Sequence, residues 1–173
     1  MMETSGTHAE GGSGYQRMKG QHSLGEVLQT AMSFEHTARE FYQSLCDRVS
    51  RPLRELVVEL AEEEDRHYKL FEELSARDDV QRHVQDRIQA PASDHRFSDY
   101  IQLPDLGSNP DDQTVLQYAL GREQAAMEQY STLAGDTPEG PIRDLFLYLA
   151  LEELAHKAEL EKRYYDLVYS TNV

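Results

Sequence analysis

Two copies of a Glu-x-x-His motif are the residues of this sequence best suited to chemistry. Glu64 and His67 lie within the string LAEEEDRH, and Glu153 and His156 lie within LALEELAH. On an α-helix an i,i+3 pair is separated by about 60°, so each carboxylate and its imidazole would project toward a common point. One such motif arises often by chance. Two copies, each preceded by a helix with a matching glutamate, indicate a carboxylate-bridged dimetal site in a four-helix bundle.

The matching glutamates belong to a second repeated string, E-x-x-A-x-E-x-Y. It begins at Glu35 and again at Glu123, 88 positions later, and it ends at Tyr42 and Tyr130. The two Glu-x-x-His motifs are 89 positions apart, so one residue of length change separates the two halves. The chain is therefore interpreted as two related helical hairpins.

Apolar residues at alternating steps of four and three predict four long helices. Their expected ranges are about 24–49, 51–76, 110–134 and 138–169. Ser23 and Glu26 fit a capping box at the start of the first helix, and Asn109 with Pro110 predicts an N-cap and a first-turn proline for the third. Each inward stripe contains one glutamate, and the stripes of the second and fourth helices also contain a histidine.

The remaining segments predict a tail and a crossover. Residues 1–22 are polar and rich in Gly and Ser without periodicity, so we expect a disordered tail before one domain at 23–170. Residues 77–109 are long enough to cross the length of a bundle. Within them, Val80, Val84 and Ile88 have the spacing of one short amphipathic helix.

Length and composition exclude several classes of protein. A chain of 173 residues fits one domain with a sizeable core. The formal charge of −15 disfavours nucleic acid or an anionic membrane as a partner. The sequence has no 18-residue apolar run and no apolar stretch of a signal peptide, so we expect a cytoplasmic protein. Cys46 is the only cysteine, which excludes an intramolecular disulfide and a four-cysteine metal site.

Four glutamates that converge in a core require positive charge, because a buried, unpaired carboxylate is costly. Two divalent ions would neutralise them. The bridging ligands would be Glu64 and Glu153, the terminal ligands Glu35 and Glu123, and the imidazoles His67 and His156. Mixed oxygen and nitrogen ligation suits Fe or Mn and also admits Zn. The alternative is that the Glu-x-x-His pairs are surface contacts and that the stripes are misassigned by one residue.

Other polar residues near the ligands have two interpretations. Tyr42 and Tyr130 each follow the glutamate of their own helix by seven residues, so they share its face. Core packing explains them, and so does a phenol that hydrogen-bonds a ligand carboxylate. Glu62, Glu63 and Asp65 fall largely off the inward stripe, and we expect them on a solvated face.

At these residues the chain resembles the ferritin-like superfamily and, within it, the rubrerythrin-like proteins. The string EHTAREFY is similar to the rubrerythrin first-helix pattern, and the Glu-x-x-His motifs and the long connection agree with it. The resemblance covers about 24–169. It implies an all-α, ferritin-like four-helix bundle with a long crossover between helices 2 and 3, two bound iron ions with Mn or Zn as alternatives, the same six ligands with both tyrosines beside them, and a homodimer.

Two departures from the rubrerythrin pattern bear on activity. Rubrerythrins commonly append a rubredoxin domain with a four-cysteine iron site, which one cysteine excludes here. They also typically carry a further Glu three residues after the third-helix ligand, where this chain has Ala126. Glu128 lies about 140° around the helix from Glu123 and cannot easily substitute. We therefore expect a symmetric six-ligand site of the kind found in ferritin-type ferroxidase centres.

The leading functional prediction is a cytoplasmic di-iron protein that oxidises Fe(II) or reduces peroxide or dioxygen, with an external electron donor if it cycles. One alternative is a protein that binds or sequesters iron without turnover. Another is a structural helical protein whose metals only stabilise the fold. Repeated peroxide consumption with a reductant would distinguish an enzyme from a sequestering protein.

Overall fold

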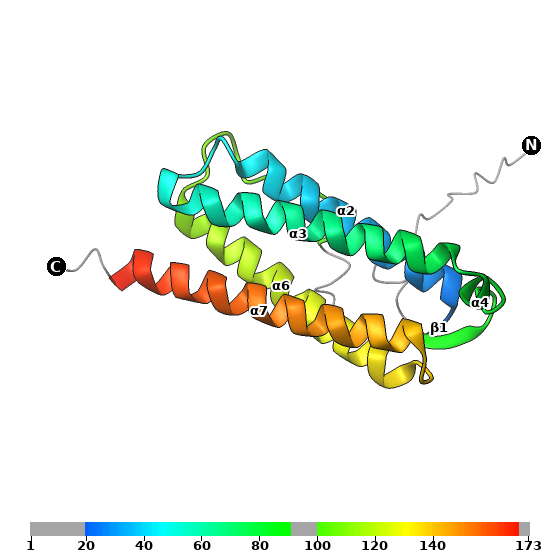
Figure 1. Cartoon of the computed structure of the whole chain (residues 1–173). Helices are drawn as coiled ribbons and strands as arrows, with labels where there is room; N and C mark the ends of the chain where they lie inside the picture. Colours follow the sequence, from blue (N-terminus) through cyan, green and yellow to red (C-terminus); the bar gives the residue numbers. More distant parts are fainter. Residues whose placement is uncertain (1–19, 91–99, 170–173) are drawn as a thin grey trace, which may run out of the picture.

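Four long helices form the body of the protein, a computed structural model that describes residues 20–90 and 100–169. They are α2 (Leu24–Leu45), α3 (Arg51–Ala76), α6 (Asp112–Asp136) and α7 (Pro141–Tyr169). Figure 1 shows them side by side as two antiparallel hairpins, α2 with α3 and α6 with α7. The predicted all-α, ferritin-like bundle is confirmed. No helix within the described residues is long and apolar enough to cross a membrane.

The helix starts follow local capping chemistry. The predicted capping box is present, since the Ser23 hydroxyl accepts from the Glu26 amide and the Glu26 carboxylate accepts from the Ser23 amide. The predicted N-cap of the third helix, Asn109, was wrong. The N-cap of α6 is Asp111, whose side chain accepts from the Thr114 amide at 2.7 Å. Asp112 instead accepts from the Ser50 amide at 3.0 Å, which ties the α2–α3 turn to the start of α6.

Two other helix ends differ from the predicted ranges. Helix α2 ends at Leu45 rather than near 49, because the chain must reach the extended conformation of Ser50 before α3 begins. Helix α7 begins at Pro141 rather than near 138. Gly140 has φ of 151°, a conformation that favours glycine, and Pro141 then takes the first helical position.

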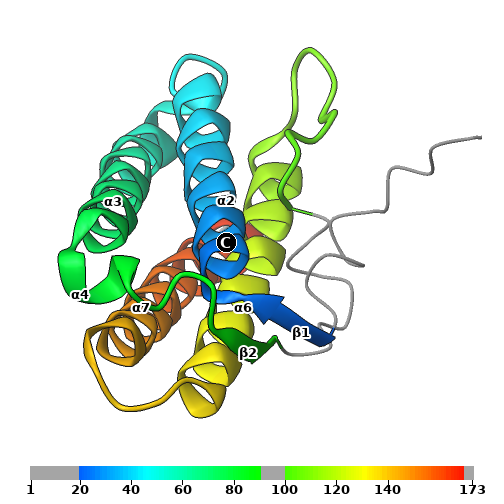
Figure 2. The same ribbon diagram turned by 90° about the vertical axis from the view of Figure 1, so that its right-hand side faces the viewer.

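The described parts of the crossover between the hairpins, residues 77–90 and 100–111, contain little helix. The short helix α4 (Asp78–Gln81) is followed by strand β2 (Arg87–Ala90), which pairs antiparallel with β1 (Gly20–Ser23) (Figure 2). The prediction of one helix through Ile88 was wrong, because that residue lies on β2. The last residues of the predicted tail, 20–22, belong to β1, and the rest of that prediction, residues 1–19, lies outside the described residues.

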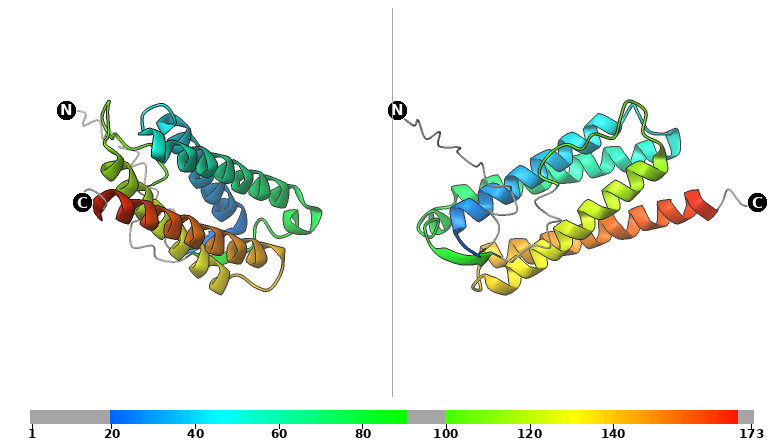
Figure 3. Two further views of the ribbon diagram at one scale, coloured as in Figure 1. Left: turned by 60° about the vertical axis from the view of Figure 1, so that its left-hand side comes forward. Right: turned by 180° about the vertical axis from the view of Figure 1, so that it is seen from behind.

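The core consists of two apolar clusters separated by a polar band. One cluster, which includes Leu28, Phe71 and Phe146, fills the end of the bundle near β1. The other, which includes Val57 and Leu116, fills the opposite end. The two views in Figure 3 show the length of the bundle along which these clusters lie. The predicted glutamates and histidines occupy the middle, so apolar packing surrounds them along the bundle axis.

Candidate metal centre

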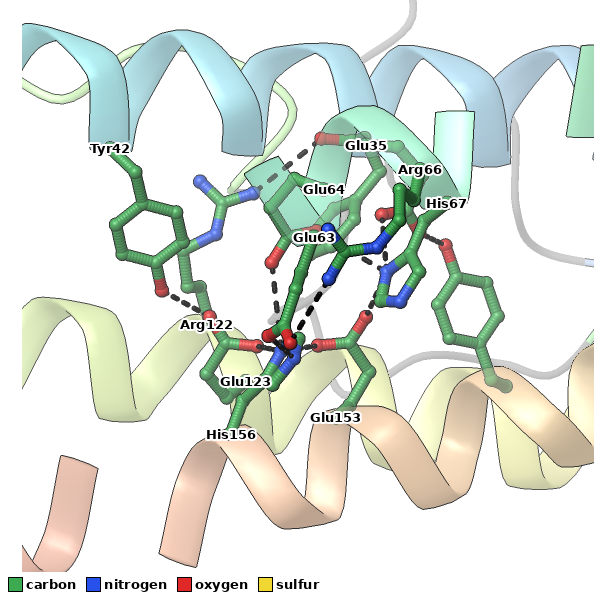
Figure 4. Close-up of polar contacts among 12 residues, drawn as sticks. Glu35, Tyr42, Glu63, Glu64, Arg66, His67, Arg122, Glu123, Glu153 and His156 are labelled. Carbon is green, nitrogen blue, oxygen red and sulfur yellow. Dashed lines mark hydrogen bonds and ion pairs between the residues drawn. The ribbon is translucent and has the colours of Figure 1, made fainter. Parts of the chain in front are cut away.

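All six predicted ligands are buried between the four helices. Each is 6% exposed or less. Helix α2 contributes Glu35, α3 contributes Glu64 and His67, α6 contributes Glu123, and α7 contributes Glu153 and His156. Figure 4 shows these side chains pointing toward one another from facing helices. The stripes identified in the sequence therefore do face inward.

The six residues form two groups that share two carboxylates. The Nδ1 atom of His67 lies 3.4 Å from Glu35 Oε2, 3.6 Å from Glu64 Oε2 and 3.4 Å from Glu153 Oε1. We call this group the Glu35 set. Both Glu64 and Glu153 direct their second oxygen to the other group, as expected of bridging carboxylates.

The second group, the Glu123 set, is arranged around His156. Its Nδ1 atom lies 3.7 Å from Glu64 Oε1, 3.6 Å from Glu123 Oε2 and 3.4 Å from Glu153 Oε2. Two ligands that each lie about 2.1 Å from one ion are separated by about 3–3.5 Å at tetrahedral or octahedral angles. The spacing in both sets is close to that separation.

Buried polar atoms without hydrogen-bond partners converge on the same space. Within the described residues they include Glu35 Oε2, His67 Nδ1, His156 Nδ1 and both carboxylate oxygens of Glu64 and Glu153. Orphaned atoms of this kind are costly unless a cation pairs with them. Oxygen and imidazole nitrogen donors fit Fe, Mn or Zn, so the residues present fit two divalent ions.

The carboxylates show how the cluster balances its charge without an ion. Burial, together with repulsion from neighbouring carboxylates, raises the pKa of Glu64 well above its usual range and that of Glu153 to about 7. Burial also opposes ionisation of Glu123, but the neighbouring Glu153 and His156 and the charge of Arg122 lower its pKa to about 2. Protons and cations would therefore compete for Glu64 and Glu153.

Burial and the neighbouring carboxylates also shift the pKa of the two imidazoles. Burial opposes their protonation, but the surrounding carboxylates outweigh it and raise the pKa of both His67 and His156. Ion binding would require these protons to leave.

The two tyrosines connect the hairpins. The Tyr42 hydroxyl donates to Glu123 Oε1, and the Tyr130 hydroxyl donates to Glu35 Oε1. Each phenol thus bonds the terminal glutamate of the opposite half. A tyrosine seven residues along a helix lies about 10 Å from its own glutamate, whereas the facing helix places the other glutamate beside it. The hydrogen-bonding interpretation of these residues is thereby favoured over packing alone.

Comparison with known proteins supports a specific family. Residues 26–102 match the rubrerythrin family model. The resemblance to rubrerythrin-like proteins is confirmed. A solved structure of a hypothetical protein from Pyrococcus furiosus shares 27% identity, covers 84% of this chain and 90% of that chain, and aligns with a TM-score of 0.66. The comparison with curated proteins gave no match.

The family match fits the chemistry of the buried groups. It covers α2 from residue 26, all of α3 and the crossover as far as residue 102, while α6 and α7 carry the repeated ligands outside the matched range. The rubrerythrin match indicates a di-iron carboxylate protein, and the acidic and histidine groups of this rubrerythrin-like chain could hold metal ions.

Glu63 has a contact that the sequence interpretation did not anticipate. It was expected on a solvated face, but its side chain is only 32% exposed and its Oε2 lies 2.6 Å from His156 Nε2. Arg66 lies 3.1 Å from its other oxygen. A carboxylate on Nε2 fixes the imidazole so that Nδ1 faces the ligand cluster. The repeat offered a signal, because Glu63 and Glu152 precede the bridging glutamates at equivalent positions.

Arg122 is a buried charge in this rubrerythrin-like chain that the sequence interpretation missed. Its guanidinium carbon lies 4.7 Å from the centre of the Phe34 ring and 5.6 Å from that of Phe41. Burial opposes the charge, but Tyr42 and Glu123 raise the pKa of Arg122, so it stays protonated. Nothing in the local pattern distinguishes it from a surface arginine, because its burial depends on how α6 packs against α2.

Proposed function

We propose that this chain binds two iron ions and oxidises Fe(II) or reduces peroxide or dioxygen. The observation that carries the proposal is the sharing of Glu64 and Glu153 between the Glu35 set and the Glu123 set. Carboxylate-bridged di-iron proteins require glutamates that contact both ion positions at once. Manganese or zinc would fit the same donors.

An iron pair bound here would supply the redox chemistry and the position at which an oxidant binds. The residues of the chain would hold the ions, orient the ligands and exclude water. Glu64 and Glu153 give one oxygen to each set, and the two tyrosines orient the terminal carboxylates. The apolar clusters at both ends of the bundle exclude water from the polar band. Sustained turnover would require an external electron donor.

The number of ligands favours iron oxidation over a specialised peroxide reductase. Ala126 is buried on the inward face of α6, one turn from Glu123, and it offers no seventh ligand. Introducing Glu at Ala126 would add a carboxylate there. We expect Ala126→Glu to increase the consumption of peroxide relative to the oxidation of Fe(II).

The direct test is anaerobic loading with Fe(II), metal analysis, and a challenge with peroxide or dioxygen. We expect two ions per chain and an absorbance change on oxidation, followed by repeated peroxide consumption when a reductant is supplied. Two ions with a single oxidation and no repeated turnover would support the alternative, an iron-binding or sequestering protein. Two ions without any oxidation would leave only a structural role for the metals.

We also propose that residues 23–170 act as one domain in a cytoplasmic homodimer. Support for the dimer comes from an apolar stripe on the outer face of α7. Its members are Leu147, Leu151, Leu154, Tyr165 and Tyr169, which are 45–67% exposed. An exposed apolar surface of this length is typical of an interface between proteins. A second copy of the chain would cover it by two-fold symmetry.

A further inference from the structure

The two halves of the metal centre differ by one buried charge. The offset of 88 residues that maps Glu35 onto Glu123 also maps Phe34 onto Arg122. Arg122 is 1% exposed and lies against the ring of Phe34 itself. One half of the centre therefore has an arginine directly before its terminal glutamate, and the other half has a phenylalanine at the equivalent position.

The charge of Arg122 has no carboxylate paired with it among the described residues. Its Nη2 donates to the Phe34 carbonyl at 3.5 Å, and its Nη1 has no hydrogen-bond partner in the described parts of the chain. A charge in a dry, apolar environment acts over a longer distance than one in water. Among the terminal ligands it is associated with Glu123, since the two residues are adjacent on α6. Figure 4 also shows Arg122 on the same side of the cluster as Tyr42, the phenol that bonds Glu123.

One carboxylate opposes this effect, but less strongly. Glu63 contacts His156 of the same half, yet it is about one-third exposed and is also paired with Arg66. Exposed ion pairs are screened by solvent, whereas the guanidinium of Arg122 is not. The net effect at the Glu123 set is an added positive charge, which repels a cation.

We propose that Arg122 makes the two ion positions unequal. The position formed by the Glu35 set fills first, and the position formed by the Glu123 set holds its ion more weakly. This inference rests on the proposed two-ion function and adds an order of filling to it. A weakly held ion exchanges readily, which suits Fe(II) that arrives as a substrate.

The test is anaerobic calorimetric titration with Co(II), a divalent probe that does not oxidise under these conditions. We expect the parent protein to bind two ions with dissociation constants that differ by at least about tenfold. In Arg122→Met the weaker constant should improve by about tenfold, so that the two steps merge. The matched control Arg122→Lys keeps the charge and should keep two separate steps.

Single-ligand variants assign the order without changing Arg122. Glu123→Gln should lose the weak step and keep the tight one, while Glu35→Gln should lose the tight step. The inference would be overturned if Glu123→Gln lost the tight step and Glu35→Gln lost the weak one. This test does not depend on whether Arg122→Met folds. Two ions with an unchanged ratio in folded Arg122→Met would also overturn it, leaving the proposed function intact. Fewer than two ions in the parent would overturn the proposed function and the inference together.

Discussion

The two hairpins agree at the metal centre and differ on their outer faces. The ligands of α3 and α7 repeat at an offset of 89 residues, and all are buried. At the same offset, Glu62 and Asp65 on α3 correspond to Leu151 and Leu154 on α7. The charged pair suits a solvated face, and the leucines are exposed apolar residues. The repeat thus persists where four carboxylates converge in the core, and it is lost on the outer faces of the helices.

A second set of differences lies just outside the ligands. Phe34 corresponds to Arg122, and Glu152 corresponds to Glu63. Of these two glutamates, only Glu63 lies within hydrogen-bonding distance of a histidine ring nitrogen in the described parts of the chain. Both changes affect the Glu123 set. An internally symmetric ligand set can therefore have asymmetric surroundings, and we expect those surroundings to set the ion affinity of each half.

The largest expected effect comes from the shared ligands. Glu64→Ala or Glu153→Ala should abolish binding of two ions, because each removes an oxygen from both sets. Glu35→Ala or Glu123→Ala should remove one ion only. Metal analysis of anaerobically loaded protein would measure the difference. Two ions in either bridging variant would show that the dimetal interpretation is wrong.

The next effect concerns pH. Glu153, with a pKa of about 7, and Glu64, whose pKa is also raised, hold protons that an ion must displace. Ion affinity should therefore increase by roughly tenfold or more per pH unit between pH 6 and 7. A raised carboxyl pKa stabilises the metal-free fold below about pH 4.5, and this contribution is lost as the pH rises through about 7.

Thermal unfolding would check this pH dependence. The melting temperature of chelator-treated protein should fall from pH 5 to pH 8, and the gain on metal loading should widen over the same interval. In Glu153→Gln the carboxyl cannot titrate, so the metal-free protein should lose less stability. A gain that shrinks as the pH rises would contradict the proton-displacement account.

The outer faces provide the third comparison. Leu151→Glu with Leu154→Glu should convert a dimer into a monomer at micromolar concentration, because like charges would replace the apolar stripe. A substitution at the corresponding position of α3, Glu62→Ala, should leave the dimer unchanged. Sedimentation or light scattering would report the mass, and metal content should stay at two ions. A parent protein that is already monomeric would end the dimer proposal.

A smaller effect is expected at the carboxylates behind the histidines. Glu63→Gln should lower the affinity of the Glu123 set for its ion by about tenfold, because the substitution removes the charge that orients His156. Glu152→Gln is the matched control and should change affinity much less. Nitrogen NMR of the metal-free protein would also report a changed imidazole state at His156 in the first variant. Equal effects of both substitutions would mean that Glu63 has no special role.

The smallest change in metal content should come from the tyrosines. Tyr42→Phe and Tyr130→Phe each remove one buried hydrogen bond, which should destabilise the metal-free protein by about 1–3 kcal/mol. Two ions should still bind, while the rate of Fe(II) oxidation changes. Unfolding curves and stopped-flow absorbance would measure the two effects. If both variants matched the parent in rate and stability, the tyrosines would serve only to fill the core.

Local sequence patterns are sufficient to predict the four long helices and the ligand candidates. Helical periodicity is a local property, so a glutamate such as Glu35 in an apolar stripe is recognisable without any tertiary information. The same reasoning placed His67 and His156 on inward faces, where the structure brings them to the shared carboxylates. It failed at the ends of helices and in the crossover, where β2 forms only because residues 20–23 pair with it.

The side chains that surround those ligands, in contrast, depend on how the helices pack together. Tyr42 bonds the glutamate of the opposite hairpin, Glu63 turns inward to His156, and Arg122 is enclosed by two phenyl rings. Each contact joins residues from different helices, and each depends on how closely those helices pack. Periodicity gives the direction of a side chain from its own helix, but the neighbour that it meets is fixed by the distance and register between helices.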